Sequence, residues 1–194
     1  EGHAELIMVG FEECRRNYKH PEKVLVTGTP VRGDFFRLTK REAKQRAGLD
    51  DGRPLIVSFF GSLGASEMNR EMAQFLALEK KGGAPFHHIH GAGAIDCRHM
   101  NEHLAAAGAD LGETPSLEVR EYIQDMAPVM RAADLVICRA GASTISELTA
   151  LGVPAIIIPS PNVANNHQEA NARVLADAGG AVMVLERDSS GEKL

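Results

Sequence analysis

The sequence predicts an α/β protein built around a largely parallel sheet. Short apolar runs, typical of buried strands, alternate along the chain with stretches that have the roughly 3.6-residue period of amphipathic helices. Glycine or other small residues separate many of these segments, as short strand-to-helix turns require. The alternation indicates βαβ units with parallel strands and right-handed crossovers.

The strands are expected in apolar runs, each bounded by glycine, proline or charged residues. In chain order these runs are 6–9, 23–27, 54–60, 86–90, 116–120, 135–138, 155–158 and 181–184. Helices are expected between them, at 11–18, 40–47, 67–78, 96–107, 126–133, 144–151 and 165–178. In the stretch 67–78, for example, apolar residues at 68, 72, 75 and 76 form one helix face. Glycine follows most of these helices, as at Gly152.

Composition excludes several classes of protein. A net charge of −5 disfavours a broad nucleic-acid-binding surface, so no nucleic acid is expected as a partner. No apolar run reaches the roughly 18 residues of a membrane span, and the first residues show no signal-peptide pattern. Cys14, Cys97 and Cys138 are widely spaced, which argues against a disulfide framework or a zinc site. We therefore expect no metal and no other cofactor.

Ligands of a parallel α/β sheet bind beyond the carboxyl ends of its strands. The loops that follow Phe60, His90, Arg120, Cys138 and Ile158 all fall at that edge. Apart from Arg32, every candidate motif described next lies in or borders one of these loops. Their convergence favours one site more strongly than any single motif does.

The most informative motif is CRAGASTISE, at residues 138–147. It joins a buried strand to a helix through small residues, which leaves backbone N–H groups free at the positive end of the helix dipole. Such a turn suits a phosphate, and Glu147 can accept hydrogen bonds from a sugar hydroxyl. These features suggest a nucleotide diphosphate site. The alternative is structural, because Thr144 and Glu147 have the spacing of a capping box.

Two other loops have both a functional and a structural interpretation. In GSLGAS, at 61–66, the glycines allow close backbone approach, and Ser62 or Ser66 can donate a hydroxyl to a phosphate. Alternatively, Ser66 is only the N-cap of the next helix. Tyr122 and Ile123 can form an apolar slot for a flat base, or pack in the core.

The stretch 162–171, NVANNHQEAN, is dense in amide side chains. Amides and imidazole both donate and accept hydrogen bonds, so they suit sugar hydroxyls and an N-acetyl group. Asn165 or Asn166 can instead cap the helix, although a cap needs only one of them. Arg32 follows a rigid turn and can reach a diphosphate or a base, or it is a surface residue of a linker.

Three histidines lie in the run 86–90. Strand alternation places His88 and His90 on one face of the strand and His87 on the other. No nearby cysteine or pair of carboxylates completes a metal site. His90, at the strand end, is the one expected to face a ligand.

These motifs resemble the bacterial peptidoglycan glycosyltransferases that form lipid II. The most specific matches are the stretch 138–147, the run Asn165-Asn166-His167-Gln168 and Asn171, within a resemblance that extends from about Val24 to Met183. The family transfers N-acetylglucosamine from UDP-N-acetylglucosamine to undecaprenyl-pyrophosphoryl-N-acetylmuramoyl-pentapeptide, called lipid I. The resemblance implies the C-terminal half of a GT-B fold, in which two Rossmann-like domains face a cleft. Thr29, Phe60 and Ile89 depart from the family's usual Asn, Gly and Gln.

The resemblance also implies roles within a donor site. Ile123 and neighbouring backbone hold uracil, Glu147 takes the ribose hydroxyls, and Ser62 faces the diphosphate with the turn at 142–144. Gln168 and its neighbours address the N-acetylglucosamine ring, and helix N-termini can stabilise the departing UDP without a metal. The expected substrate-binding residues are Arg32, Ser62, Gly64, Tyr122, Ile123, Ala142, Ser143, Thr144, Glu147, His167, Gln168 and Asn171.

The same resemblance predicts two segments. Residues 1–29 would be the tail of an N-terminal acceptor domain and its linker, poorly ordered or packed against another chain. Residues 30–194 would be the UDP-N-acetylglucosamine-binding domain, with a truncated C-terminal end. In the family the acceptor domain carries the catalytic base, the lipid I site and the peripheral contact with the cytoplasmic face of the plasma membrane. The catalytic residues are therefore unassigned, and this chain alone is expected to bind donor without transfer.

Two alternatives stay open. A UDP-N-acetylglucosamine 2-epimerase resembles the same fold and binds the same donor, although the HQEAN run and the TPVR linker favour the transferase. A non-catalytic nucleotide-sugar sensor would bind the donor unaltered. The lack of a GxGxxG motif disfavours a nicotinamide dehydrogenase.

Overall fold

The computed structural model describes residues 2–112, 114–163 and 166–194. Its main body is a six-stranded sheet in the order β5-β4-β3-β6-β7-β8, in which every neighbouring pair is parallel. The predicted α/β class is confirmed. The strands are β3 (Leu55–Phe59), β4 (His87–Gly91), β5 (Leu117–Arg120), β6 (Leu135–Cys138), β7 (Ala155–Ile157) and β8 (Ala181–Met183).

The strand order reverses between β3 and β6. The chain builds outward from β3 to β5 on one side, returns to β6, and then builds outward to β8 on the other. This is the Rossmann order, and the reversal leaves a crevice at the carboxyl ends of the two central strands. The loops after β3 and β6 therefore flank the place where such folds bind ligands.

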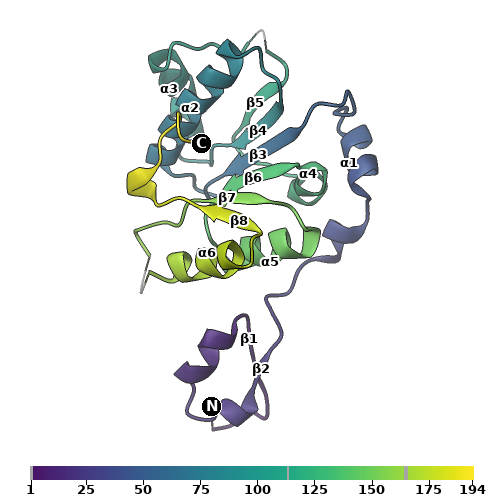
Figure 1. Ribbon diagram of the computed structural model, residues 1–194, viewed down its shortest axis with the longest axis vertical. Coiled ribbons are helices and arrows are strands. Elements are labelled where there is room, and N and C mark those ends of the chain that lie inside the picture. The colour runs from purple at the N-terminus through teal and green to yellow at the C-terminus, as the bar shows by residue number, and fades with distance from the viewer. Residues whose placement is uncertain (1, 113, 164–165) are drawn as a thin grey trace.

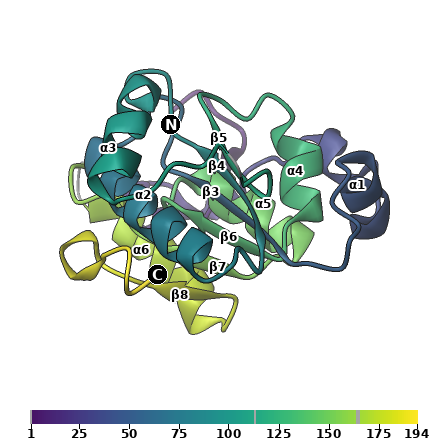
Figure 2. The same cartoon turned by 90° about the horizontal axis from the view of Figure 1, so that it is seen from above.

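Helices cover both faces of the sheet (Figures 1 and 2). Helices α2 (Ser66–Lys81) and α3 (Met100–Ala106) pack together over one face. Helices α4 (Met126–Ala132), α5 (Ala142–Leu151) and α6 (His167–Asp177) cover the other, and α1 (Lys40–Arg46) packs against α4. Strand alternation creates the two layers, because Val57 joins the core beneath α4 and α5, whereas Ile56 packs with Met68 and Met72 of α2.

The N-terminal segment forms a separate pair of parallel strands, β1 (Ile7–Val9) and β2 (Val24–Val26), below the main body in Figure 1. Met8 pairs in register with Leu25, and both side chains are exposed. The assignment of residues 1–29 to another domain stays a prediction. Among the described residues, no helix combines the length and apolar character needed to cross a bilayer.

Two predicted helices differ in type from the observed ones. Residues Glu12–Asn17 form a 3₁₀ helix with no buried residue, and Cys97–His99 form a 3₁₀ turn before α3. In the first stretch no buried residue anchors a longer α-helix, whereas in the second the α-helix begins only at Met100, which is buried. Further 3₁₀ turns lie at Pro21–Lys23, Gly33–Phe36 and Glu186–Asp188. Helix α2 begins at Ser66 with Ala65 as its N-cap residue, so the N-cap interpretation of Ser66 is wrong.

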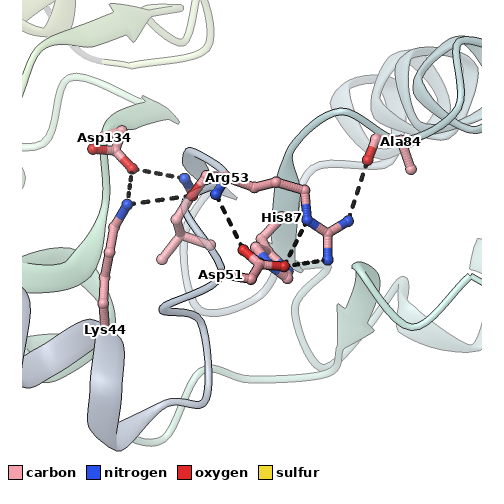
Figure 3. A network of polar contacts seen from close by, with 7 residues as sticks. Lys44, Asp51, Arg53, Ala84, His87 and Asp134 are labelled. Atoms are coloured by element: carbon pink, nitrogen blue, oxygen red, sulfur yellow. Dashed lines mark hydrogen bonds and ion pairs between the residues drawn. The ribbon is translucent and has the colours of Figure 1, made fainter.

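Charged groups join the amino-terminal ends of the central strands (Figure 3). Asp134, just before β6, accepts hydrogen bonds from the backbone N–H of Leu55 at 2.8 Å and from Lys44 Nζ at 2.5 Å. Asp51 contacts His87 Nε2 at 2.9 Å and Arg53 Nε at 2.8 Å. This network lies at the opposite end of the strands from the crevice, so we assign it to stability.

Replacing Asp134 with asparagine is expected to lower the free energy of unfolding at pH 7 by about 1–2 kcal/mol. Burial alone would raise the pKa of Asp134, but hydrogen bonds from Lys40, Lys44 and the Leu55 amide outweigh it and lower the pKa to about 2. The folded state therefore gains from the carboxylate above its unfolded pKa of about 4 and loses that gain as the pH falls toward 2.

Urea denaturation at pH 7 and near pH 3 measures the difference in the free energy of unfolding between the wild-type protein and Asp134→Asn. Asp188→Asn serves as the control, because Asp188 is an exposed carboxylate outside the network. A destabilisation by Asp134→Asn that is the same at both pH values would show that the carboxylate charge is not responsible.

Candidate functional site

A cavity of about 200 Å³ opens at the carboxyl edge of the sheet. Four predicted residues, from three different loops or helices, meet in its wall: Ser62, Tyr122, Ile123 and Thr144. The remaining lining residues are Phe59, Gly61, Gly91, Gly93, Glu121 and Met126. A larger hollow of about 830 Å³ lies between α2 and the loop after α3, away from the strand ends, and none of the predicted residues lines it. We therefore take the smaller cavity as the candidate site and call it the donor pocket, after the donor site that the sequence resemblance predicts.

Two glycine-containing loops touch at the floor of this pocket. Gly64 and Gly93 have φ values of +84° and +85°. A Cβ on Gly64 would lie 2.1 Å from the carbonyl oxygen of Ala92, and a Cβ on Gly93 would lie 2.1 Å from the Gly64 nitrogen. Only glycine fits this approach. Gly64 thus supports the pocket without lining it, and the neighbouring Ser62 is held at the wall.

Helix α5 begins without a side-chain cap on its first backbone N–H groups. Its N-cap residue is Gly141, which provides no side-chain hydrogen bond, and the helix starts at Ala142. Thr144 is therefore the third helical residue, so the capping-box interpretation of Thr144 and Glu147 is wrong. Ser143 is exposed, and Thr144 faces the pocket. A first turn without a side-chain cap presents its N–H groups to an anion.

Glu147 lies one turn further along α5 and is half-buried. Burial raises its pKa, and the nearby positive charge of Arg32 partly opposes that shift. Arg32 itself lines a neighbouring hollow of about 510 Å³, which shares Met126 with the donor pocket. The structure thus makes Arg32 and Glu147 electrostatic neighbours beside the pocket and does not put Arg32 in its wall.

The amide-rich run holds the turn that precedes α5. Gln168 Oε1 accepts hydrogen bonds from the backbone N–H groups of Ser160 at 2.9 Å and Ala140 at 3.3 Å. Asn171 Nδ2 donates to the carbonyl of Ala140 at 3.0 Å. These two side chains therefore connect the loops after β6 and β7. Their sugar-binding role stays a prediction.

The start of α6 is only partly described. His167, the first residue of the helix, is exposed. Asn166 occupies the N-cap position with φ +50°, but its side chain donates to Glu169 Oε2 at 2.6 Å and caps no backbone group. Asn165, the other candidate cap, lies outside the described residues. Capping by Asn166 therefore does not account for the run of amides.

His90 does not face the pocket. It is fully buried, with Nδ1 2.8 Å from Ser58 Oγ and Nε2 3.1 Å from Asn69 Oδ1. The expectation that it faces a ligand is wrong, because strand alternation points its ring at α2, which covers that face. The alternation correctly placed His88 and His90 on the same face of β4, since both contact Ser58. No group of three or more metal-binding side chains is present among the described residues.

Gly91, Gly93 and Met126 are pocket residues that sequence reasoning missed. Gly91 and Gly93 follow a predicted strand, as Gly61 and Gly64 do, and this repeated pattern was the available signal. Met126 was assigned only to a helix, and nothing in its local pattern distinguishes a pocket wall from core.

Comparison with known proteins agrees with this geometry. Residues 55–194 match the family model described as the glycosyltransferase family 28 C-terminal domain. A curated relative from Thermoanaerobacter sp. (strain X514), named UDP-N-acetylglucosamine–N-acetylmuramyl-(pentapeptide) pyrophosphoryl-undecaprenol N-acetylglucosamine transferase, is 42% identical over 189 residues. The match covers 97% of this chain and 50% of the relative. The chain thus spans about half the length of such relatives.

Solved structures show the same fold. The crystal structure of MurG from Acinetobacter baumannii superposes with a TM-score of 0.65 at 28% identity, over 89% of this chain and 47% of that one. A putative UDP-N-acetylglucosamine 2-epimerase from Listeria monocytogenes gives a TM-score of 0.66 at 14% identity, over 97% and 48%, which shows the fold alone. The six-stranded sheet corresponds to the C-terminal half of GT-B glycosyltransferases. The family match and the level of identity to its curated relatives together show that this chain belongs to the glycosyltransferase family 28 C-terminal domain family.

Proposed function

We propose that this chain is the donor-binding domain of a glycosyltransferase that transfers N-acetylglucosamine from UDP-N-acetylglucosamine to lipid I, forming lipid II in peptidoglycan synthesis. One observation carries the proposal: a single pocket at the strand-order reversal brings together the apolar slot, the serine loop and the uncapped start of α5. The identity to transferases of that name supports the choice of donor and acceptor.

Each part of the pocket suits one part of a nucleotide sugar. Ile123, Met126 and Phe59 provide apolar surface for a flat base. Ser62 and the first turn of α5, formed by Ala142, Ser143 and Thr144, provide donors for the diphosphate. Glu147 accepts from ribose hydroxyls beside Arg32. Gln168, with His167 and Asn171, addresses the sugar ring near the turn that it helps to hold.

The chemistry assigned to this half is stabilisation of the leaving group. As the bond between sugar and diphosphate breaks, negative charge builds up on UDP. N–H groups at the start of α5, already oriented by the helix, stabilise that charge without reorganising. We place the acceptor site, the catalytic base and peripheral contact with the cytoplasmic face of the membrane outside this chain, and we expect the chain alone to bind donor without transfer.

Calorimetric titration is expected to show saturable binding of UDP-N-acetylglucosamine and at least about tenfold weaker binding of UDP-N-acetylgalactosamine. The two sugars differ only in the configuration of one ring hydroxyl, and a mispaired hydroxyl costs about 1–3 kcal/mol. UDP alone is the third ligand. Equal affinity for all three ligands would show that the amide-rich run does not bind the sugar. Lack of binding by a chain that is folded by circular dichroism would contradict donor binding itself.

A further inference from the structure

A chain of buried hydrogen bonds runs from the interior of the main body to the floor of the donor pocket. Ser58 lies on β3 and His88 and His90 on β4, while Asn69 and Glu79 lie on α2. The first four side chains are fully buried, and Glu79 is 6% exposed. Buried polar groups destabilise a protein unless they are paired, so five in succession require a structural or functional reason.

The contacts are short and consecutive. His88 bridges Glu79 and Ser58, with Nδ1 2.8 Å from Glu79 Oε2 and Nε2 2.8 Å from Ser58 Oγ. Ser58 Oγ also lies 2.8 Å from His90 Nδ1, and His90 Nε2 lies 3.1 Å from Asn69 Oδ1. At the far end, Asn69 Nδ2 donates to the carbonyl of Ala92 at 2.7 Å.

The position of each proton in the hydrogen-bond chain can be assigned by starting from the end nearest the pocket. The carbonyl oxygen of Ala92 can only accept, so the amide nitrogen of Asn69 faces it and the amide oxygen faces His90. His90 therefore carries a proton on Nε2. Burial lowers the pKa of His90 to about 3, so the ring is neutral and its Nδ1 accepts from the Ser58 hydroxyl.

The remaining links are then determined. Ser58 has donated its only hydroxyl proton to His90, so its oxygen accepts from His88 Nε2–H. The contact between His88 Nδ1 and Glu79 Oε2 forms the inner end of the chain. Every group from His88 to Ala92 is satisfied in this one direction, which makes the chain a rigid connection.

Ala92 is where the chain meets the pocket floor. Its carbonyl oxygen lies 2.1 Å from the place that a Cβ on Gly64 would occupy, and Asn69 Nδ2 lies 3.4 Å from the same point. The next residue, Gly93, lines the pocket and donates its backbone N–H to Glu121 at 2.9 Å. The position of the Ala92 carbonyl thus determines where both glycine-containing loops lie.

We propose that Ser58, His90 and Asn69 are positioning residues of the donor pocket. They hold the Ala92 carbonyl, and through it the backbone of Gly64 and Gly93, in the arrangement that receives the diphosphate. None of the three lines the pocket, so they act only through the backbone that they fix. The identity of the ligand rests on the proposed function, whereas the hydrogen-bond chain does not depend on it.

Two variants interrupt the chain: Ser58→Ala, which removes one oxygen atom, and His90→Phe. His87→Phe is the matched control, because His87 lies at the opposite end of the same strand and pairs with Asp51. Amide hydrogen exchange in the ligand-free protein reports on Gly64 and Gly93, and calorimetry gives the affinity for UDP-N-acetylglucosamine. Nitrogen NMR of the wild-type protein reports the tautomer of His90.

In both chain variants we expect exchange at Gly64 and Gly93 to be about tenfold faster, with β6 protection unchanged, and donor affinity about tenfold lower. His87→Phe should change neither, and His90 should be the neutral Nε2–H tautomer at pH 7. If His90→Phe fails to fold, the exchange and affinity of Ser58→Ala alone test the positioning role. Wild-type exchange and affinity in Ser58→Ala, or an Nδ1–H tautomer, would overturn the proposal. If the wild-type protein binds no donor, the proposed function fails, and the exchange data still decide the positioning role.

Discussion

Replacing Gly64 with alanine is expected to weaken the binding of UDP-N-acetylglucosamine by at least about 100-fold, or roughly 2.7 kcal/mol. Gly64 has φ +84°, and the new Cβ would lie 2.1 Å from the carbonyl oxygen of Ala92. That oxygen cannot retreat easily, because it accepts a hydrogen bond from the buried Asn69 Nδ2 at 2.7 Å. The loop after β3 must therefore move away, which displaces Ser62 from the pocket wall. Calorimetric titration measures the loss of affinity.

Gly83→Ala provides a matched control. Gly83 has φ +85°, almost the same as Gly64, but nothing lies within 4 Å of the position that its Cβ would take. Both variants carry the strain of a left-handed alanine, about 1–2 kcal/mol, and only Gly64→Ala adds a collision. Urea denaturation should show the shared strain, whereas donor binding should be lost in Gly64→Ala alone. Equal donor affinity in the two variants would show that the close approach of the loops does not shape the pocket.

The arrangement of the sheet was predictable because a short run of apolar residues marks each strand. Strand β6 occupies the predicted residues 135–138, and the other strands lie within the predicted runs or extend one residue past them. The parallel topology then follows from the alternation with helices, and it brings the strand-end loops together. This is why Ser62, Ile123 and Thr144, far apart in sequence, could be predicted to share one site.

Features that depend on a contact between two elements were not predictable. The requirement for glycine at 93 comes from the Gly64 backbone, which belongs to another loop. The alternation along β4 correctly grouped His88 with His90, but it could not show that α2 buries that face. Likewise, the spacing of Thr144 and Glu147 fits a capping box, and only the observed start of α5 at Ala142 excludes it.

Changing Glu147 to glutamine is expected to weaken donor binding by roughly 10-fold to 100-fold while stabilising the folded chain at neutral pH. The first effect follows because hydrogen bonds from ribose hydroxyls to a carboxylate contribute about 1.5–3 kcal/mol. The second follows because burial raises the pKa of Glu147 in the folded state. A carboxyl with a raised folded pKa binds protons more tightly when folded, so the folded state loses stability as the pH rises through that pKa. Glutamine carries no charge and avoids this loss.

Glu71→Gln separates the two effects. Glu71 lies on α2, its pKa is also raised by burial, and it is not among the residues that line the donor pocket. Both variants should therefore gain stability in urea denaturation at pH 7, but only Glu147→Gln should lose affinity for the donor. Wild-type affinity should also fall on acidification, from a higher pH than an ordinary glutamate would give, and Glu147→Gln should lack this dependence. If Glu147→Gln gains stability and keeps wild-type affinity, the carboxylate is a buried charge without a role in binding the ribose.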